Sequence, residues 1–201
     1  MKNLIILGVP RAGKSTLAKY VTKQLISEGV PVVLMPADSI VGGLTARRAG
    51  FMWRIFVRPT RHIFPCLLKR SKKSLENNLC RFIKRFVDET SLDFPIIFEG
   101  AYISPSKAEH MFDPKKCKIV VVGYPNATLE EKIKNIRQFD DNTAISKQDD
   151  ITIKKTITTF IKISKQYEKE SKNKFVFLDT SKQYHKTLCD FAKNVSEFLT
   201  E

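Results

Sequence analysis

Eight residues near the start of the chain, Gly8 to Ser15, read Gly-Val-Pro-Arg-Ala-Gly-Lys-Ser. They match the phosphate-binding loop pattern G-x-x-x-x-G-K-[ST] at every fixed position. The apolar run Leu4 to Leu7 directly precedes them, and apolar residues recur at helical spacing afterwards until Gly29. Such a loop needs a strand before it and a helix after it, because its amides and the positive helix end must converge on one polyphosphate. Both flanks are present, so the sequence predicts a nucleotide-binding loop.

Each loop position has a physical role in holding a nucleotide. Gly8 and Gly13 permit close approach of the backbone, and Lys14 places an ammonium among the β- and γ-phosphate oxygens. Ser15 offers a hydroxyl to Mg2+, and Thr16 extends the pair of hydroxyls. The residues expected to bind the nucleotide are Gly8, Val9, Pro10, Arg11, Ala12, Gly13, Lys14, Ser15 and Thr16.

Length and composition fit a single α/β domain over residues 1–201. With 42% hydrophobic residues the chain can bury a core without a partner. Short apolar runs alternate with helical patterns, as a parallel sheet flanked by helices requires. Strands are expected at residues 4–7, 32–35, 96–99, 118–123 and 174–178, and the later helices at residues 128–139, 151–172 and 183–199. A capping box of Thr128 with Glu131 opens the first of these helices.

Several classes of protein are disfavoured. The four cysteines, at 66, 80, 117 and 189, form no C-x-x-C pair, which argues against a zinc site and a disulfide framework. No run approaches the roughly 18 apolar residues of a membrane span. The segment beginning at Asn173-Lys174 lacks the aspartate with which GTPases bind guanine. We therefore expect a soluble, cytoplasmic protein with reduced cysteines.

With this order of elements the chain resembles the P-loop small-molecule kinases, which include adenylate-kinase-like, shikimate, gluconate and chloramphenicol kinases. The resemblance spans essentially the whole chain and rests on residues 8–16, Asp38, Phe98-Glu99-Gly100 and Arg137. It implies the α/β fold of P-loop NTPases, a five-stranded parallel sheet flanked by helices. It also implies a short lid at about residues 134–150, a helical acceptor-binding insertion at about residues 40–94, and transfer of a γ-phosphoryl group from Mg-ATP to a small acceptor.

Two acids at predicted strand ends are the candidate catalytic carboxylates. The resemblance implies that Asp38 orients the acceptor or takes its proton, although Asp38 would equally serve as a helix N-cap. Glu99 closes four apolar residues, as in a Walker B strand, and would hold a Mg2+-bound water beside Ser15 or meet the acceptor. Gly100 would let the chain pass close to the substrate. Which carboxylate is the base stays open.

Arg137 and Lys134 lie three residues apart, just before the polar run 140–150. The resemblance implies that Arg137 reaches the transferring phosphoryl group from the lid and neutralises its charge. The same residues, with Lys132, also fit a solvated basic helix face. The resemblance further implies that Asp179-Thr180-Ser181 borders the adenine.

Residues 44–85 hold twelve Lys and Arg but one acid, Glu76, so we expect an anionic neighbour. Arg47, Arg54 and Arg58 fall at spacings of seven and four, which a helix would place on one face. The resemblance puts the acceptor here, and Arg47 and Arg54 would suit an acceptor that carries phosphate or carboxylate. A solvated basic surface explains the same charges.

Two other binding partners are compatible with the sequence, and one difference from a kinase motif bears on the identity of the acceptor. Aromatic residues interleave with the arginines over residues 51–64, as on some nucleic-acid-binding surfaces, so a nucleic-acid-binding or nucleic-acid-modifying ATPase stays open. Residues 51–57 could instead contact an anionic membrane surface. Nucleoside monophosphate kinases usually carry Asp-Gly-Phe-Pro-Arg where this chain reads Phe98-Glu99-Gly100-Ala101-Tyr102. Adenylate is therefore disfavoured, and a small anionic metabolite, nucleoside or nucleotide is expected as acceptor.

Overall fold

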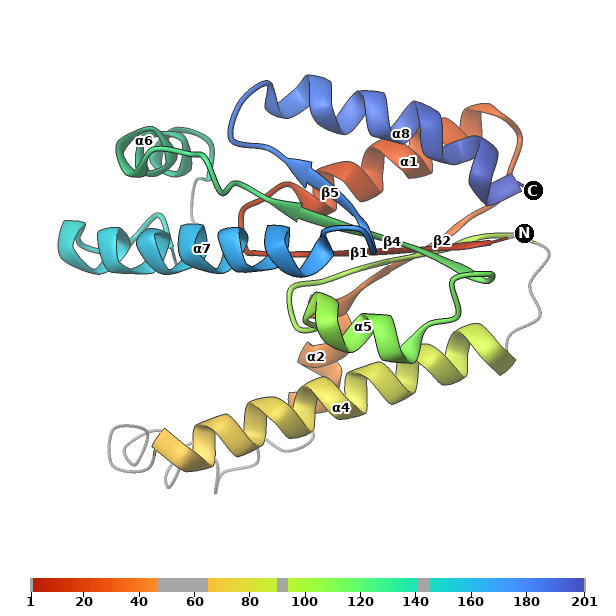
Figure 1. Cartoon of the computed structure of the whole chain (residues 1–201), viewed down its shortest axis with the longest axis horizontal. Coiled ribbons are helices and arrows are strands. Elements are labelled where there is room, and N and C mark those ends of the chain that lie inside the picture. The colour runs from red at the N-terminus through yellow and green to blue at the C-terminus, as the bar shows by residue number, and fades with distance from the viewer. Residues whose placement is uncertain (1, 47–64, 90–93, 141–144, 201) are drawn as a thin grey trace.

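A five-stranded, entirely parallel sheet lies at the centre of the molecule, with helices on both faces (Figure 1). The computed structural model describes residues 2–46, 65–89, 94–140 and 145–200. The spatial order of the strands is β2-β3-β1-β4-β5. Their bounds are β1 (Asn3–Gly8), β2 (Val33–Pro36), β3 (Ile96–Glu99), β4 (Cys117–Gly123) and β5 (Val176–Asp179). All five predicted strands are confirmed, with ends within two residues of the expected ones.

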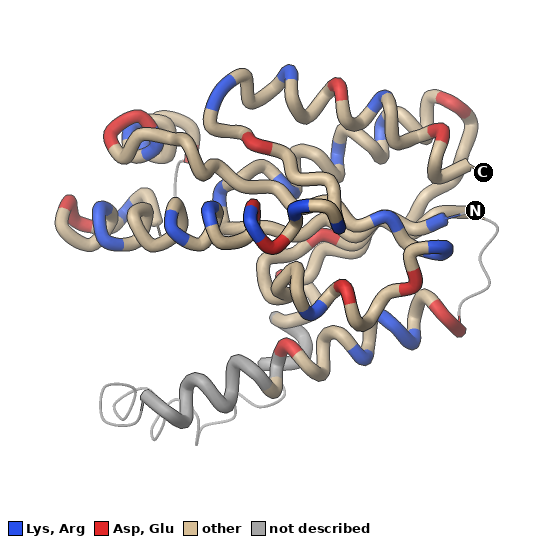
Figure 2. Tube along the Cα trace, viewed as in Figure 1, with Lys and Arg blue, Asp and Glu red and all other residues tan. Residues whose placement is uncertain are grey.

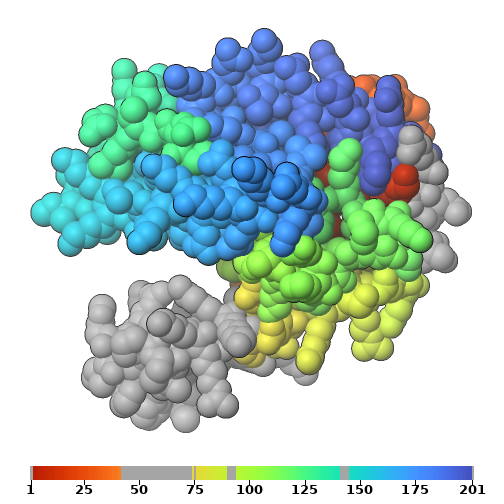
Figure 3. All heavy atoms as spheres, in the orientation of Figure 1, coloured from red at the N-terminus to blue at the C-terminus, as the bar shows by residue number. Residues whose placement is uncertain are grey.

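The helices form a layer on each face of the sheet. One face is covered by α1 (Lys14–Ser27) and α8 (Tyr184–Thr200), and the other by α2 (Ala37–Ala46), α4 (Pro65–Glu89) and α5 (Pro105–Met111). At one end of the molecule α6 (Leu129–Phe139) packs on α7 (Asp150–Ser171) (Figure 3). The three later helices confirm the sequence prediction. The short α5 was not predicted, because seven residues span too few turns for a helical period to emerge.

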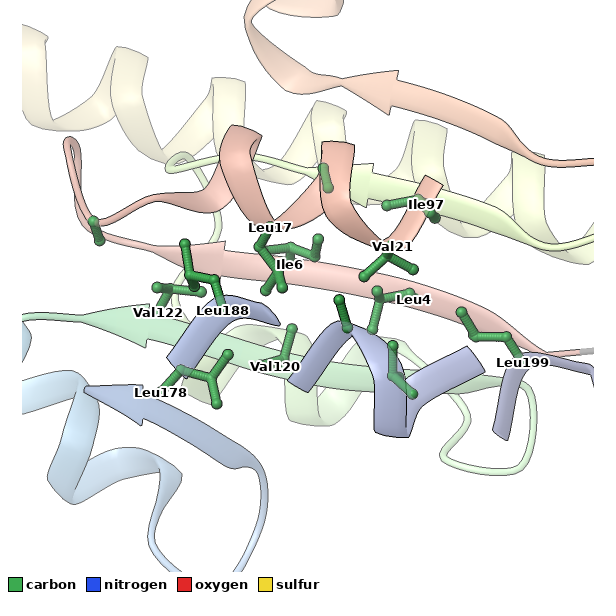
Figure 4. Packing of buried hydrophobic residues seen from close by; sticks show 14 of the residues in the cluster. Leu4, Ile6, Leu17, Val21, Ile97, Val120, Val122, Leu178, Leu188 and Leu199 are labelled. Atoms are coloured by element: carbon green, nitrogen blue, oxygen red, sulfur yellow. The ribbon is translucent and has the colours of Figure 1, made fainter. Parts of the chain in front are cut away.

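Both faces of the central strand are buried, which explains the unbroken apolar run before the loop. Leu4 and Ile6 belong to the cluster shared with α1 and α8, whereas Ile5 and Leu7 belong to the cluster under α2, α4 and α5. All four side chains are fully buried. Figure 4 shows the first cluster, with Leu17 and Val21 of α1 and Leu188 and Leu199 of α8 around β1. A parallel strand covered on both faces shows no alternation of polar residues.

The end of β1 admits only glycine. Gly8 has φ of 139°, and a Cβ there would lie 1.9 Å from the carbonyl oxygen of Val122 in β4. We expect Gly8→Ala to lower the free energy of unfolding by at least about 3 kcal/mol, measured by urea denaturation. Gly29→Ala is the matched control, since Gly29 has φ of 77° but nothing within 4 Å of its Cβ position. Its cost should be about 1 kcal/mol. Equal costs would show that Val122 does not confine Gly8.

Part of the basic segment, residues 44–85, lies in α4, and two of its basic side chains there are exposed and paired. Lys84 and Arg85 of α4 pair with acids one turn later, Asp88 and Glu89, at 3.0 and 2.8 Å. Such exposed pairs contribute a few tenths of a kcal/mol to a helix. Acidic and basic residues are also interspersed along the other outer helices (Figure 2). The predicted acceptor-binding residues Arg47 and Arg54, with Arg58, lie outside the described residues.

No helix in the described ranges is long and apolar enough to cross a membrane. Among the cysteines that the structure describes, Cys80 and Cys117 are buried, Cys189 is partly buried, and all three are free thiols. Burial raises the pKa of both Cys80 and Cys117 to about 11, so neither is a reactive thiolate near neutral pH.

Candidate active site

The phosphate-binding loop leaves β1 and enters α1 as the sequence predicts. Gly13 precedes the helix with φ of 102°, and Arg11 adopts a left-handed φ of 62°. Four successive carbonyl oxygens of the loop accept hydrogen bonds from side chains. The donors are Lys14 Nζ to Val9 at 2.8 Å, Tyr124 Oη to Pro10 at 3.0 Å, Lys132 Nζ to Arg11 at 2.8 Å and Thr180 Oγ1 to Ala12 at 3.0 Å. The Thr180 hydroxyl also lies 3.0 Å from Gly123 O, so it shares its one proton between two carbonyl groups.

Lys14 is a buried cation at the mouth of the loop. Its side chain is 8% exposed. Burial lowers the pKa of Lys14 to about 8, and the carboxylates of Glu99 and Asp38 oppose that shift. Both acids therefore lie close enough to Lys14 to act on its charge. A buried ammonium beside the loop amides is suited to neutralise an incoming polyphosphate.

Ser15 and Glu99 bring two oxygen ligands together beside Lys14. Ser15 Oγ donates to Glu99 Oε1 at 3.1 Å. Glu99 is only 7% exposed, and it ends β3 opposite Ile6 of β1 and Pro36 of β2. Mg2+ is usually bound by one or two protein oxygens together with phosphate oxygens, so a hydroxyl and a carboxylate fit it. Within the described residues there is no cluster of three His, Cys, Asp or Glu side chains that would hold a metal without such help.

Asp38 lies in the first turn of α2, directly after β2. Because α2 begins at Ala37, Asp38 is inside the helix and the N-cap alternative from the sequence is wrong. Tyr102 lies beside its carboxylate, and burial together with this acid raises the pKa of the Tyr102 hydroxyl. The sequence reasoning treated Tyr102 only as a departure from a family pattern. The structure makes it the neighbour of Asp38.

Gly100 serves packing at this edge of the sheet. A Cβ at Gly100 would lie 2.4 Å from Ala37 Cβ, and its backbone N–H donates to Ile6 O at 3.0 Å. The space expected for a substrate next to Gly100 is therefore filled by the first residue of α2. The missing side chain lets α2, and with it Asp38, sit close to β3.

A cavity of about 1090 Å³ opens beside the loop, large enough for a nucleotide. Its walls are Arg11 and Gly13 to Thr16 of the loop, one side of α6, and residues 180–185 after β5. Thr180 and Ser181 line it, whereas Asp179, the third residue expected to border the adenine, does not. Tyr184 donates to Thr16 Oγ1 at 2.9 Å, and its ring lies 2.7 Å from the position of a Cβ on Gly13.

The basic residues of α6 that line the cavity are not the one expected from the sequence, Arg137. Arg137 pairs with Asp150 Oδ1 at 2.5 Å at the start of α7 and is not among the residues that line the cavity. Lys134 and Lys132 do line it. Lys132 was missed as an individual residue. A signal existed, because Lys132 lies three and four residues from Leu129 and Ile136, within the apolar stripe of the helix.

Comparisons with known proteins give a fold but no close relative. No known family model matches the chain, and no curated protein matches it. Among solved structures, the shikimate kinase from Acinetobacter baumannii in complex with shikimate matches with a TM-score of 0.57, at 14% identity, over 98% of this chain and 92% of that one. The shikimate kinase from Bacteroides thetaiotaomicron matches with a TM-score of 0.53, at 13% identity, over 100% and 99%. The fold is that of the P-loop small-molecule kinases. At these identities the likeness concerns fold, and it confirms the fold class predicted from the sequence.

Proposed function

We propose that the protein is a kinase that transfers the γ-phosphoryl group of ATP, with Mg2+, to a hydroxyl group of a small anionic molecule. The observation that supports it most is the convergence of Lys14, the Ser15–Glu99 pair and Asp38 at the carboxyl ends of β1, β2 and β3. Ligands bind at this edge in open parallel sheets. A donor-binding cation, a metal-binding pair and a carboxylate for the acceptor are the parts that phosphoryl transfer requires.

The proposed reaction is an in-line displacement at the γ-phosphorus. The acceptor oxygen forms a bond to phosphorus, the bond to the bridging β,γ-oxygen breaks, and ADP leaves. Lys14 and the loop amides hold the phosphates, Asp38 orients the acceptor hydroxyl and takes its proton, and Tyr102 lies beside the Asp38 carboxylate. Mg2+, held by Ser15 and Glu99, would neutralise charge on the phosphate oxygens.

The proposal also includes the kind of acceptor and the role of Arg137 in a lid. The excess of basic residues over residues 44–85, including Arg47 and Arg54, favours an acceptor that carries phosphate or carboxylate. Arg137 would have to leave Asp150 to act as a lid arginine. An ATP-dependent enzyme of this kind would act in the cytoplasm, as one domain over residues 1–201.

The test is ADP release from Mg-ATP across a panel of possible acceptors, with salt concentration varied. The panel comprises nucleosides, nucleotides, phosphorylated and carboxylated metabolites, neutral alcohols, and short RNA and DNA. Stimulation by a small acidic or phosphorylated molecule, with transfer of the label from γ-labelled ATP to it, supports the proposal. Stimulation only by nucleic acid, falling steeply with salt, would contradict it and favour a nucleic-acid-dependent ATPase.

A further inference from the structure

The carbonyl groups of the phosphate loop are held from outside by three elements of the fold. Besides Lys14, which belongs to the loop itself, the donors are Tyr124 at the end of β4, Lys132 in α6 and Thr180 after β5. They bind three consecutive carbonyl oxygens, those of Pro10, Arg11 and Ala12. None of these three donors is one of the four fixed residues of the phosphate-loop pattern.

In a trans peptide, a hydrogen bond that fixes the carbonyl group also fixes the direction of the N–H of the next residue. The C=O and N–H of one peptide unit point in opposite directions, and the described chain has no cis peptide. A donor that fixes the Pro10 carbonyl therefore aims the N–H of Arg11 the other way. In the same manner Lys132 orients the N–H of Ala12, and Thr180 orients the N–H of Gly13. The amides expected to bind phosphate are thus oriented by donors on the opposite side of the loop.

Lys132 and Tyr124 form one unit within this arrangement. The Tyr124 side chain is fully buried, and the Lys132 ammonium lies 4.0 Å from its ring centroid. Burial lowers the pKa of Lys132 to about 8, Asp140 opposes that shift, and Arg11 adds to it. A cation over an aromatic face is stabilised when it is removed from water. The ammonium is thus held in place by the ring, by the Arg11 carbonyl and by Asp140.

The loop needs such support at Arg11. A residue other than glycine in the left-handed region costs on the order of 1 kcal/mol, and Arg11 has φ of 62°. Its carbonyl is bound by Lys132, and its guanidinium pairs with Asp140 at 3.1 Å. Both contacts come from α6 and the residue that follows it. One helix therefore holds both ends of the strained residue.

We propose that Lys132 and Tyr124 are positioning residues, which hold the phosphate loop in its nucleotide-binding shape by binding the carbonyl groups of Arg11 and Pro10. This inference rests on the nucleotide-binding part of the proposed function and does not depend on the identity of the acceptor. It differs from a direct role of Lys132 in binding the nucleotide. Tyr124 decides between the two, since its hydroxyl binds Pro10 and it is not among the residues lining the cavity.

The experiment compares ADP and adenosine binding by calorimetry in the full-length protein and its variants. We expect Tyr124→Phe and Lys132→Met each to weaken ADP binding about tenfold, the loss that one hydrogen bond of this kind accounts for. Adenosine affinity should stay within about twofold, because adenosine has no phosphate for the loop to hold. The double variant should lose less than the product of the single losses, because the two residues support one loop conformation.

Two variants serve as matched controls. Tyr167→Phe removes the hydroxyl of a partly buried tyrosine, and Lys154→Met removes an exposed charge, both in α7. Neither should change ADP affinity. Should Lys132→Met fail to fold, Lys132→Arg keeps a donor near Arg11 O and should bind ADP more tightly than any folded variant without one.

Other outcomes would overturn the inference. Unchanged ADP binding in Tyr124→Phe, with weakened binding in Lys132→Met, would mean that Lys132 contacts the nucleotide itself. Equal loss of ADP and adenosine affinity would indicate general damage to the cavity. If wild type binds ADP but phosphorylates no acceptor, the proposed kinase function fails while this inference can still be tested. If wild type binds neither ligand, both fail.

Discussion

Replacement of Lys14 with methionine is expected to abolish phosphoryl transfer and, at the same time, to make the nucleotide-free protein more stable. The activity falls because the loop motif uses Lys14 to place an ammonium among the β- and γ-phosphate oxygens. Loss of a group that stabilises transferring charge costs at least about a hundredfold in kcat/KM. A folded Lys14→Met protein that retains transfer would contradict the proposed function.

The gain in stability follows from the burial of the Lys14 ammonium, whose desolvation outweighs its favourable contacts. The pKa of Lys14 is about 8 in the folded protein, against an ordinary value of 10.5. Below pH 8 the charge is present in both states, so folding bears the full cost of burying it, up to about 3 kcal/mol. Methionine removes this cost and also the hydrogen bond to Val9. The net gain in the free energy of unfolding near pH 7 should be about 1 to 3 kcal/mol.

The sign of the pH dependence provides a second measurement on the same variants. Between about pH 8 and 10.5 the unfolded chain binds a proton at Lys14 that the folded chain has lost. The contribution of Lys14 to the free energy of unfolding of the wild type therefore rises with pH across that window. This rise should be missing in Lys14→Met. Lys19→Met, an exposed change on the same helix, should leave both the pH profile and the stability within about 0.5 kcal/mol of wild type. A Lys14→Met protein that is less stable than wild type would contradict the account.

Sequence was sufficient for the sheet because its inner strands, β1, β3 and β4, are buried on both faces, and the partly exposed edge strands β2 and β5 are still mostly apolar. Runs such as Ile96 to Glu99 have to be apolar, and the loop motif specifies which strand comes first. The helices of the second half were readable because they are long and amphipathic. The spatial order β2-β3-β1-β4-β5 was not predicted, since no local pattern specifies which parallel strands are neighbours.

The site was less predictable than the fold because its contacts are made between distant residues. The loop residues and Glu99 follow from motifs within a few positions. The contacts of Tyr102 with Asp38 and of Lys132 with Arg11 join residues that are 64 and 121 positions apart. No spacing rule encodes such a pair. Gly100 was found from the sequence, but its role was not. A glycine at a strand end lets either a substrate or a helix approach the backbone closely, and here Ala37 of α2 occupies the space.

The second large effect is expected for Asp38→Asn, which should lower kcat by about a hundredfold to ten-thousandfold and leave nucleotide affinity within about threefold. Asparagine keeps the size of the side chain, but it cannot take a proton from the acceptor. Tyr102→Phe retains the carboxylate and removes only the hydroxyl beside it, so kcat should fall about tenfold. Ser39→Ala, an adjacent exposed change in α2, should have no effect.

The measurement has to be made near pH 7, because Asp38 also acts on Lys14. Its carboxylate opposes the effect of burial, so in Asp38→Asn the pKa of Lys14 should fall below about 8. Nucleotide affinity of that variant should therefore weaken at a lower pH than in the wild type, while at pH 7 most of the charge remains. A loss of ATP affinity at pH 7 with kcat preserved would place Asp38 on the donor side. If kcat and affinity both survive, the base must be sought elsewhere, and Glu99 then becomes the first carboxylate to replace, because it is the other acid that acts on Lys14.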